Sequence, residues 1–169
     1  FSGGWRVSRE NFLKDVSWLN DLKIRGSWGQ LGNQNIGTYP YQSTLSGANY
    51  AFGGSVSSGF IANTLVDPSL TWETTRVGDI GLDMSILNNK LVLSADYFNK
   101  YTFDILRSSQ VPFYIGLNAP TINDGALRNK GFEFALQYND RIGRDFSYSI
   151  GVNLQTYKNK LERYGSKDI

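Results

Sequence analysis

The carboxylates that could carry chemistry in this chain fall on one side of the strands that its sequence predicts. They are Asp79, Asp83, Asp96 and Glu133. Two carboxyl groups about 5–9 Å apart can hydrolyse a glycosidic bond, and carboxylate oxygens also bind hard cations. Lys23 and Arg25 fall on the same side of a neighbouring predicted strand, so a water-exposed sheet surface with both positive and negative side chains also explains these four carboxylates. We favour this water-exposed surface, and expect no catalytic residue, no metal site and no cofactor.

Composition removes several other classes of chemistry. The chain has neither cysteine nor histidine, so a thiolate metal site, a disulfide framework and the commonest general base are all missing from these residues. The net charge is only +2, and the 17 basic residues are scattered from Arg6 to Lys167. Because no basic block occurs, we expect no nucleic-acid partner.

Two long predicted loops, about 30–70 and 107–129, carry side chains suited to ligand contact. Flat aromatic faces stack on sugar rings, and amide side chains both donate and accept hydrogen bonds. The alternative is that these side chains pack against neighbouring loops. The candidate contact residues are Asn33, Gln34, Asn35, Tyr39, Tyr41, Phe113 and Tyr114.

The elements that must position these residues are β-strands. Apolar and polar residues alternate in the windows 22–28, 80–86, 91–97, 132–138 and 146–154. In each window, the first residue and every second residue after it are apolar, except for Gly26. The residues between them are polar or glycine, except for Val92 and Ala135. A period of two indicates strands rather than helices. We predict six strands, at about 1–8, 22–29, 71–87, 90–106, 130–138 and 146–157.

A tight turn fixes the register of one predicted hairpin. Asn88 and Asn89 suit a two-residue turn because asparagine tolerates positive φ. The resulting pairs join apolar with apolar, and polar with polar or glycine: Met84 with Leu93, Asp83 with Ser94, Leu82 with Ala95, and Gly81 with Asp96. A slip of one residue would ruin this match.

The connections between the predicted strands alternate in length. Residues 88–89 and 139–145 are short, whereas 30–70 and 107–129 are long. Outer-membrane barrels alternate short periplasmic turns with long extracellular loops in this way. A strand of about 10 residues tilted by ~45° rises ~23 Å, close to their ~25 Å apolar band. The alternative is a soluble β-sandwich or barrel, such as a carbohydrate-binding module, with the apolar side inside.

On the membrane interpretation the two sides of each strand face different solvents. The lipid-facing candidates are Leu82, Met84, Leu93, Phe132, Phe134, Leu136, Ile150 and Val152. The lumen-facing candidates are Lys23, Arg25, Asp79, Asp83, Asp96, Glu133, Gln137 and Asn153.

Several motifs, in order along the chain, resemble the SusC/RagA type of TonB-dependent outer-membrane transporters. They are LKIRGSWGQLGNQNIGTYPYQSTL (22–45), DPSLTWETTRVGDIGLDMSILNNKLVLSADYFNKYTFDIL (67–106), LRNKGFEFAL (127–136) and FSYSIGVNLQTYKNKL (146–161). The loop at 46–65 departs most from that pattern. The resemblance implies an all-β fold: an antiparallel up-and-down transmembrane segment, about six strands of a larger barrel of about 22 strands.

The resemblance also implies a function and partners. Such a protein is a bacterial outer-membrane nutrient importer for oligosaccharides, glycans or peptides, driven by the TonB complex and covered by a SusD-like surface lipoprotein. The loop candidates would then contact the substrate or this lid. No stretch here resembles the plug domain, the TonB box or a signal peptide. Because six strands cannot close such a barrel, we expect this chain to be part of a longer one.

Overall fold

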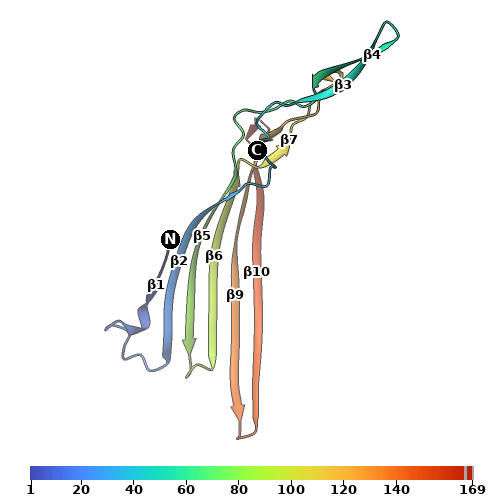
Figure 1. Ribbon diagram of the computed structural model, residues 1–169. Coiled ribbons are helices and arrows are strands. Elements are labelled where there is room, and N and C mark those ends of the chain that lie inside the picture. Colours follow the sequence, from blue (N-terminus) through green and yellow to red (C-terminus); the bar gives the residue numbers. More distant parts are fainter. Residues whose placement is uncertain (166, 169) are drawn as a thin grey trace. The chain divides into compact units, whose positions relative to one another are not determined.

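The computed structural model describes residues 1–165 and 167–168 of the chain (Figure 1). They form two compact units. The first comprises Phe1–Leu31, Thr75–Tyr101 and Leu127–Leu161, and the second comprises Gly32–Thr74, Thr102–Ala126 and Glu162–Ile169. None of the helices among the described residues is long and apolar enough to span a membrane.

Seven strands form the main sheet, and they follow one another in chain order, apart from two small hairpins. The order is β1-β2-β5-β6-β9-β10-β11, and Figure 1 shows the long strands of this sheet side by side. Their bounds are Ser2–Arg6 (β1), Leu19–Asn33 (β2), Glu73–Ile86 (β5), Leu91–Phe103 (β6), Ala126–Ile142 (β9), Phe146–Tyr164 (β10) and Lys167–Asp168 (β11). All six predicted strands are present, so the predicted up-and-down all-β segment is confirmed.

The predicted bounds need correction at several ends. Residues 7–8 were predicted to be strand, but Val7–Arg9 forms a short 3-10 helix (η1) in which Val7 is buried. The strand predicted at 22–29 runs on to Asn33, so this loop candidate belongs to β2. The last two long strands also extend beyond their predicted ends, to Ile142 and Tyr164. Polar residues continue these strands because the backbone ladder needs no apolar side chain once the partner strand is in place.

The predicted loops at about 30–70 and 107–129 contain short strands of their own in the second unit. Strands β3 (Leu45–Phe52) and β4 (Ser55–Ala62) pair from Leu45↔Ala62 to Phe52↔Ser55. Gly53 and Gly54 make the turn with φ of 56° and 83°, as a two-residue hairpin turn requires. The second predicted loop contains β7 (Leu106–Ser108) paired with β8 (Thr121–Asn123), and the 3-10 helix η2 (Phe113–Ile115).

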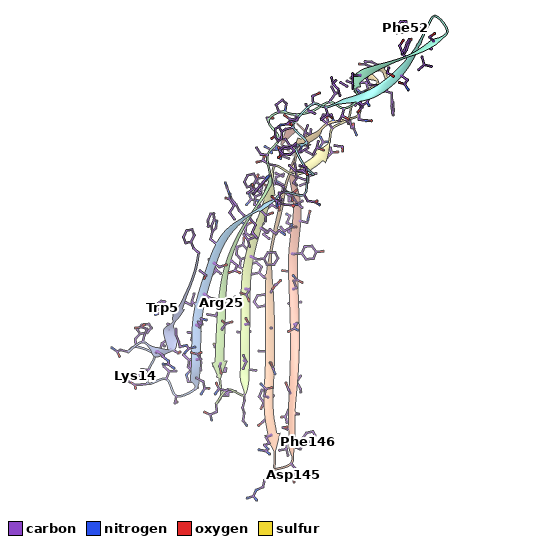
Figure 2. The ribbon with its side chains drawn as sticks, viewed as in Figure 1. Trp5, Lys14, Arg25, Phe52, Asp145 and Phe146 are labelled. Carbon is purple, nitrogen blue, oxygen red and sulfur yellow. The ribbon has the colours of Figure 1, made fainter. Side chains whose placement is uncertain are left out.

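The sheet has side chains on both sides and very little buried apolar surface (Figure 2). Among the described residues, only Val7 and Ala126 are buried apolar side chains. Phe134 and Val152, in the middle of β9 and β10, are 42% and 61% exposed. The apolar side of the sheet therefore lies uncovered, whereas a soluble sandwich would bury it under a second layer.

Candidate functional site

An ion network crosses three strands on the polar side of the sheet. The guanidinium of Arg25 on β2 donates from Nε to Asp83 Oδ2 on β5 at 3.0 Å. Its Nη2 lies 2.7 Å and 2.8 Å from the two carboxylate oxygens of Asp96 on β6. Ser94 Oγ donates to Asp83 Oδ1 at 3.0 Å, as the predicted register requires. One arginine thus ties two carboxylates across β2, β5 and β6.

Gly81 makes the space that this network fills. A Cβ atom at Gly81 would overlap the Asp96 carboxylate and would lie 2.6 Å from Arg25 Cζ. Any larger residue would push the guanidinium away from the carboxylates. The sequence alone predicted Gly81 opposite Asp96, but not the arginine that lies between them.

The four predicted carboxylates have different surroundings. Asp83 and Asp96 share one cation, Asp79 lines a hollow with Lys23 and Arg25, and Glu133 accepts a hydrogen bond from Gln155 Nε2 at 2.7 Å. Among the described residues, no group of three or more histidine, cysteine or acidic side chains could hold a metal ion. The arrangement is a hydrogen-bonded polar wall.

Removing the central cation should weaken this wall. We expect Arg25→Met to leave the two carboxylates facing each other and to lower the stability of the assembled protein by about 1 kcal/mol, since the partly exposed groups regain water. Urea unfolding followed by tryptophan fluorescence measures the change. Lys100→Met, on the same side of β6, is the control. An equal effect of both substitutions would contradict a specific role for Arg25.

Gln137 and Asn153, the other two predicted polar-side residues, lie further along β9 and β10. Gln137 Nε2 donates to Ser149 Oγ at 3.1 Å on the partner strand. Asn153 lines a shallow hollow with Glu133 and Asp96. Side-chain hydrogen bonds on the polar side therefore link β2, β5 and β6 in one group, and β9 with β10 in another.

Aromatic side chains gather at two places on the apolar side. Tyr97, at the centre of β6, and Phe132 on β9 approach with ring centroids 5.0 Å apart. Tyr138 lies 6.2 Å from Tyr148 by ring centroids near the short-turn ends. Aromatic pairs of this kind flank the apolar band of outer-membrane barrels. Between them lie the aliphatic candidates Leu82, Met84, Leu93, Leu136, Ile150 and Val152.

A salt bridge lies below this band, at the short-turn end. Asn139 N donates to Lys90 O at 2.7 Å, which brings the β5–β6 turn beside β9. Lys90 Nζ lies 2.6 Å from Asp140 Oδ1, and Tyr138 Oη donates to Oδ2 at 2.9 Å. The Lys90 ammonium, helped by the Arg141 amide and the Tyr138 hydroxyl, lowers the pKa of Asp140 to about 2.

This lowered pKa makes the stability of the fold depend on pH in a defined direction. Because the folded pKa of Asp140 lies below its ordinary value of 3.8, the salt bridge stabilises the fold above that value and is lost as pH falls through about 2. We expect a carboxyl carbon NMR titration of the protein in micelles to give a midpoint near 2, and Lys90→Met to return it toward 3.8. A midpoint near 3.8 in the unaltered protein would contradict the salt bridge.

The loop candidates all lie in the second unit, and only some of them touch. Asn33 Oδ1 accepts from the Asn35 amide at 3.1 Å, and Gln34 O accepts from Ile36 N at 2.7 Å. Tyr39 and Tyr41 meet edge to face with centroids 6.2 Å apart. The other two aromatic candidates, Phe113 and Tyr114, are fully or almost fully exposed.

Sequence reasoning missed two features of the second unit. Asn123 binds three backbone groups and one hydroxyl: its Oδ1 accepts from Thr71 N at 2.6 Å and from Thr71 Oγ1, and its Nδ2 donates to Thr71 O and Asp104 O. The β3–β4 hairpin also exposes Tyr50, Phe52 and Phe60. Its alternation around Gly53-Gly54 was the signal that could have found it.

The fold and the two-sided sheet define a segment of an outer-membrane β-barrel wall. Residues 5–168 match the family described as TonB dependent receptor-like, beta-barrel, and the chain belongs to that family. It is 34% identical over 171 residues to the TonB-dependent receptor SusC of Bacteroides thetaiotaomicron, covering 98% of this chain and 17% of SusC. It is 33% identical over 164 residues to the TonB-dependent receptor P3 of Formosa agariphila, covering 97% of this chain and 16% of P3.

Solved structures share the fold. The RagAB peptide transporter matches with a TM-score of 0.81 at 24% identity, over 96% of this chain and 18% of that chain. The RagAB peptide importer in the open-open state matches with a TM-score of 0.82 at 25% identity, over 95% of this chain and 17% of that chain. The chain spans about one sixth of the length of the curated relatives it matches.

Family membership decides between the interpretations of the sequence. It confirms the resemblance to SusC/RagA-type transporters and the outer-membrane localisation. The family comprises transporters rather than enzymes, so the glycoside-hydrolase alternative is set aside. The soluble binding module is set aside as well, because the family is a family of membrane barrels.

Proposed function

We propose that this chain forms part of the wall and the extracellular loops of a longer nutrient importer. The observation that carries the proposal is the two-sided sheet: an uncovered apolar side backed by the Arg25, Asp83 and Asp96 network on the other side. A barrel wall in lipid needs both surfaces at once. The apolar side then faces lipid, and the polar side faces a wet lumen.

The order of strands supports this placement within a barrel. Each long strand pairs with the next long strand along the chain, which is how up-and-down barrels close. In such a barrel the short connections at 87–90 and 143–145 would lie at the periplasmic side, and the long connections at 34–72 and 104–125 would lie at the cell surface. The remaining strands, a plug and a TonB-contacting segment would come from the rest of the longer chain.

The substrate class that we propose is a peptide or an oligosaccharide. The RagAB relatives are peptide transporters, and the exposed aromatic loop residues Tyr39, Tyr41, Phe113 and Tyr114 suit flat sugar or peptide faces. Asn33, Gln34 and Asn35 add amide groups near Tyr39. A SusD-like surface lipoprotein would contact the same loops as a lid, and the TonB complex would supply the energy.

Uptake in living cells tests the proposal. The whole receptor is expressed in an outer-membrane host that lacks other importers, with and without TonB, and fluorescent oligopeptides and maltooligosaccharides are supplied. We expect uptake of one class, dependent on TonB, and a marked loss in the Tyr39→Ala, Tyr41→Ala variant at an unchanged amount of receptor. Ser57→Ala in the β3–β4 hairpin is the control. Uptake that is indifferent to TonB would contradict the proposal.

A further inference from the structure

Hydrogen bonds join the two long connections of the second unit at two places. The connections are 34–72, between β2 and β5, and 104–125, between β6 and β9. At the first junction Asn118 N donates to Asn63 O at 2.7 Å, and Leu65 N donates to Asn118 O at 3.0 Å. Both bonds join backbone groups, so this junction pairs the two connections as a sheet pairs its strands.

The second junction is the side-chain amide of Asn123. Its Oδ1 accepts from Thr71 N at 2.6 Å and from Thr71 Oγ1 at 3.3 Å. Its Nδ2 donates to Thr71 O at 2.8 Å and to Asp104 O at 2.9 Å. An asparagine amide has one acceptor oxygen and two donor hydrogens, so this one side chain is fully used. It binds both backbone groups of a residue on the other connection.

The backbone that carries Asn123 is held on its own connection. Asn123 pairs with Leu106 in the β7–β8 ladder, and Asp124 N donates to Ile105 O at 2.8 Å. Asp124, only 9% exposed, also forms a salt bridge with Arg107. These contacts fix the start of the Asn123 side chain, and a fixed start loses little entropy when the amide binds the other connection.

The Thr71 side of this junction is also ordered. Ser69 N donates to Asp67 Oδ1 at 2.8 Å in a tight turn just before Thr71. Directly after it, Trp72 covers Gly32 near the end of β2, since a Cβ there would lie 2.9 Å from Trp72 Cε3. Asn123 therefore joins two ordered segments rather than two free loops.

We propose that Asn123 is a positioning residue: it makes the two connections move as one body and so holds their aromatic side chains for ligand binding. The inference rests on the proposed function, in which Tyr39 and Tyr41 on one connection and Phe113 and Tyr114 on the other contact the substrate. Connections that moved separately would have to be ordered at every binding event, and that cost would lower the affinity.

Hydrogen exchange of the whole receptor in neutral detergent tests the coupling without any substrate. The control for Asn123→Ala is Asn49→Ala, because Asn49 accepts from Ser58 Oγ at 2.9 Å within the β3–β4 hairpin of a single connection. We expect the Leu65 amide, which binds Asn118 and not Asn123, to exchange several-fold faster in Asn123→Ala and normally in the control. Unchanged exchange at Leu65 in Asn123→Ala would overturn the inference.

Uptake kinetics separate positioning from a merely structural role. Cells that contain TonB are given the fluorescent oligopeptides and maltooligosaccharides, and rates are divided by the amount of surface receptor. If one receptor in about ten keeps both connections in place, Asn123→Ala should raise the half-saturating concentration about tenfold. The maximal rate should stay nearly constant, and Asn49→Ala should change neither value. A lower maximal rate at an unchanged half-saturating concentration would contradict positioning.

A covalent link at the first junction should rescue the variant. Thr64 and Asn118 form a parallel β-bridge, and strands paired in this way lie about 4.8 Å apart, within the Cα range of a disulfide. Thr64→Cys with Asn118→Cys, added to Asn123→Ala, should form a disulfide and restore the half-saturating concentration until it is reduced. A disulfide without recovery, or none under mild oxidant, would overturn the inference. Absence of uptake by the unaltered receptor would contradict the proposed function instead, and the exchange result would still decide this inference.

Discussion

An arginine at Leu82 or Ile150 should prevent assembly of the receptor in the outer membrane. Both residues lie in the middle of the apolar side, on β5 and β10, and Ile150 is 60% exposed in this segment. Arginine on the lipid side of a barrel near the bilayer midplane costs about 2–4 kcal/mol. Heat-modifiable migration of membrane-extracted protein, together with surface labelling, measures the assembled fraction. We expect a large drop for Leu82→Arg and Ile150→Arg.

The matched control is Ser149→Arg, adjacent to Ile150 on the same strand but on the polar side. Its side chain would project into water, where arginine carries no such cost. We therefore expect Ser149→Arg to assemble almost normally. Equal tolerance, or equal loss, at Ser149 and Ile150 would contradict the assignment of the two sides.

Alanine at Gly131 should separate β9 from β10. A Cβ atom there would overlap Thr156 O and would lie 2.9 Å from Tyr157 Cα. Both atoms belong to the backbone of the partner strand, so no side-chain rotation can relieve the overlap. Overpacking of this kind costs about 3 kcal/mol. We expect Gly131→Ala to lower the urea midpoint of the assembled receptor clearly, measured by loss of its heat-modifiable form.

Gly151→Ala provides the comparison within the same hairpin. The nearest atom to a Cβ at Gly151 is Leu136 O at 3.9 Å, an ordinary contact. The substitution should leave the midpoint almost unchanged. If Gly131→Ala were as mild as Gly151→Ala, the close approach of the two strands at this point would be wrong.

Much of the sheet could be predicted because its signal is local. Alternation along one strand depends only on neighbouring residues, and the Asn88-Asn89 turn fixed the β5–β6 register without any distant information. In the structure Asn88 and Asn89 have φ of 57° and 63°, and the Ser94–Asp83 hydrogen bond confirms the pairing. Leu87 also adopts a left-handed φ of 54°, which its sequence neighbours did not indicate.

The features that escaped prediction depend on contacts between distant residues. Arg25 joins Asp83 and Asp96 only because β2, β5 and β6 lie side by side, and no local pattern encodes that juxtaposition. The β3–β4 hairpin was hidden for a different reason: glycine and serine on both strands gave a loop-like composition around a clear two-glycine turn.

The central claim is that lipid contacts the side of the sheet that carries Phe134, and water the side that carries Glu133. The chain contains no cysteine, so a nitroxide label can be introduced through Phe134→Cys or Glu133→Cys in the whole receptor, with any cysteine elsewhere replaced. Reconstituted in bilayers, the label at 134 should relax mainly with oxygen and the label at 133 mainly with a water-soluble nickel chelate. The reverse pattern, or equal access of the nickel chelate to both positions, would contradict the barrel-wall assignment.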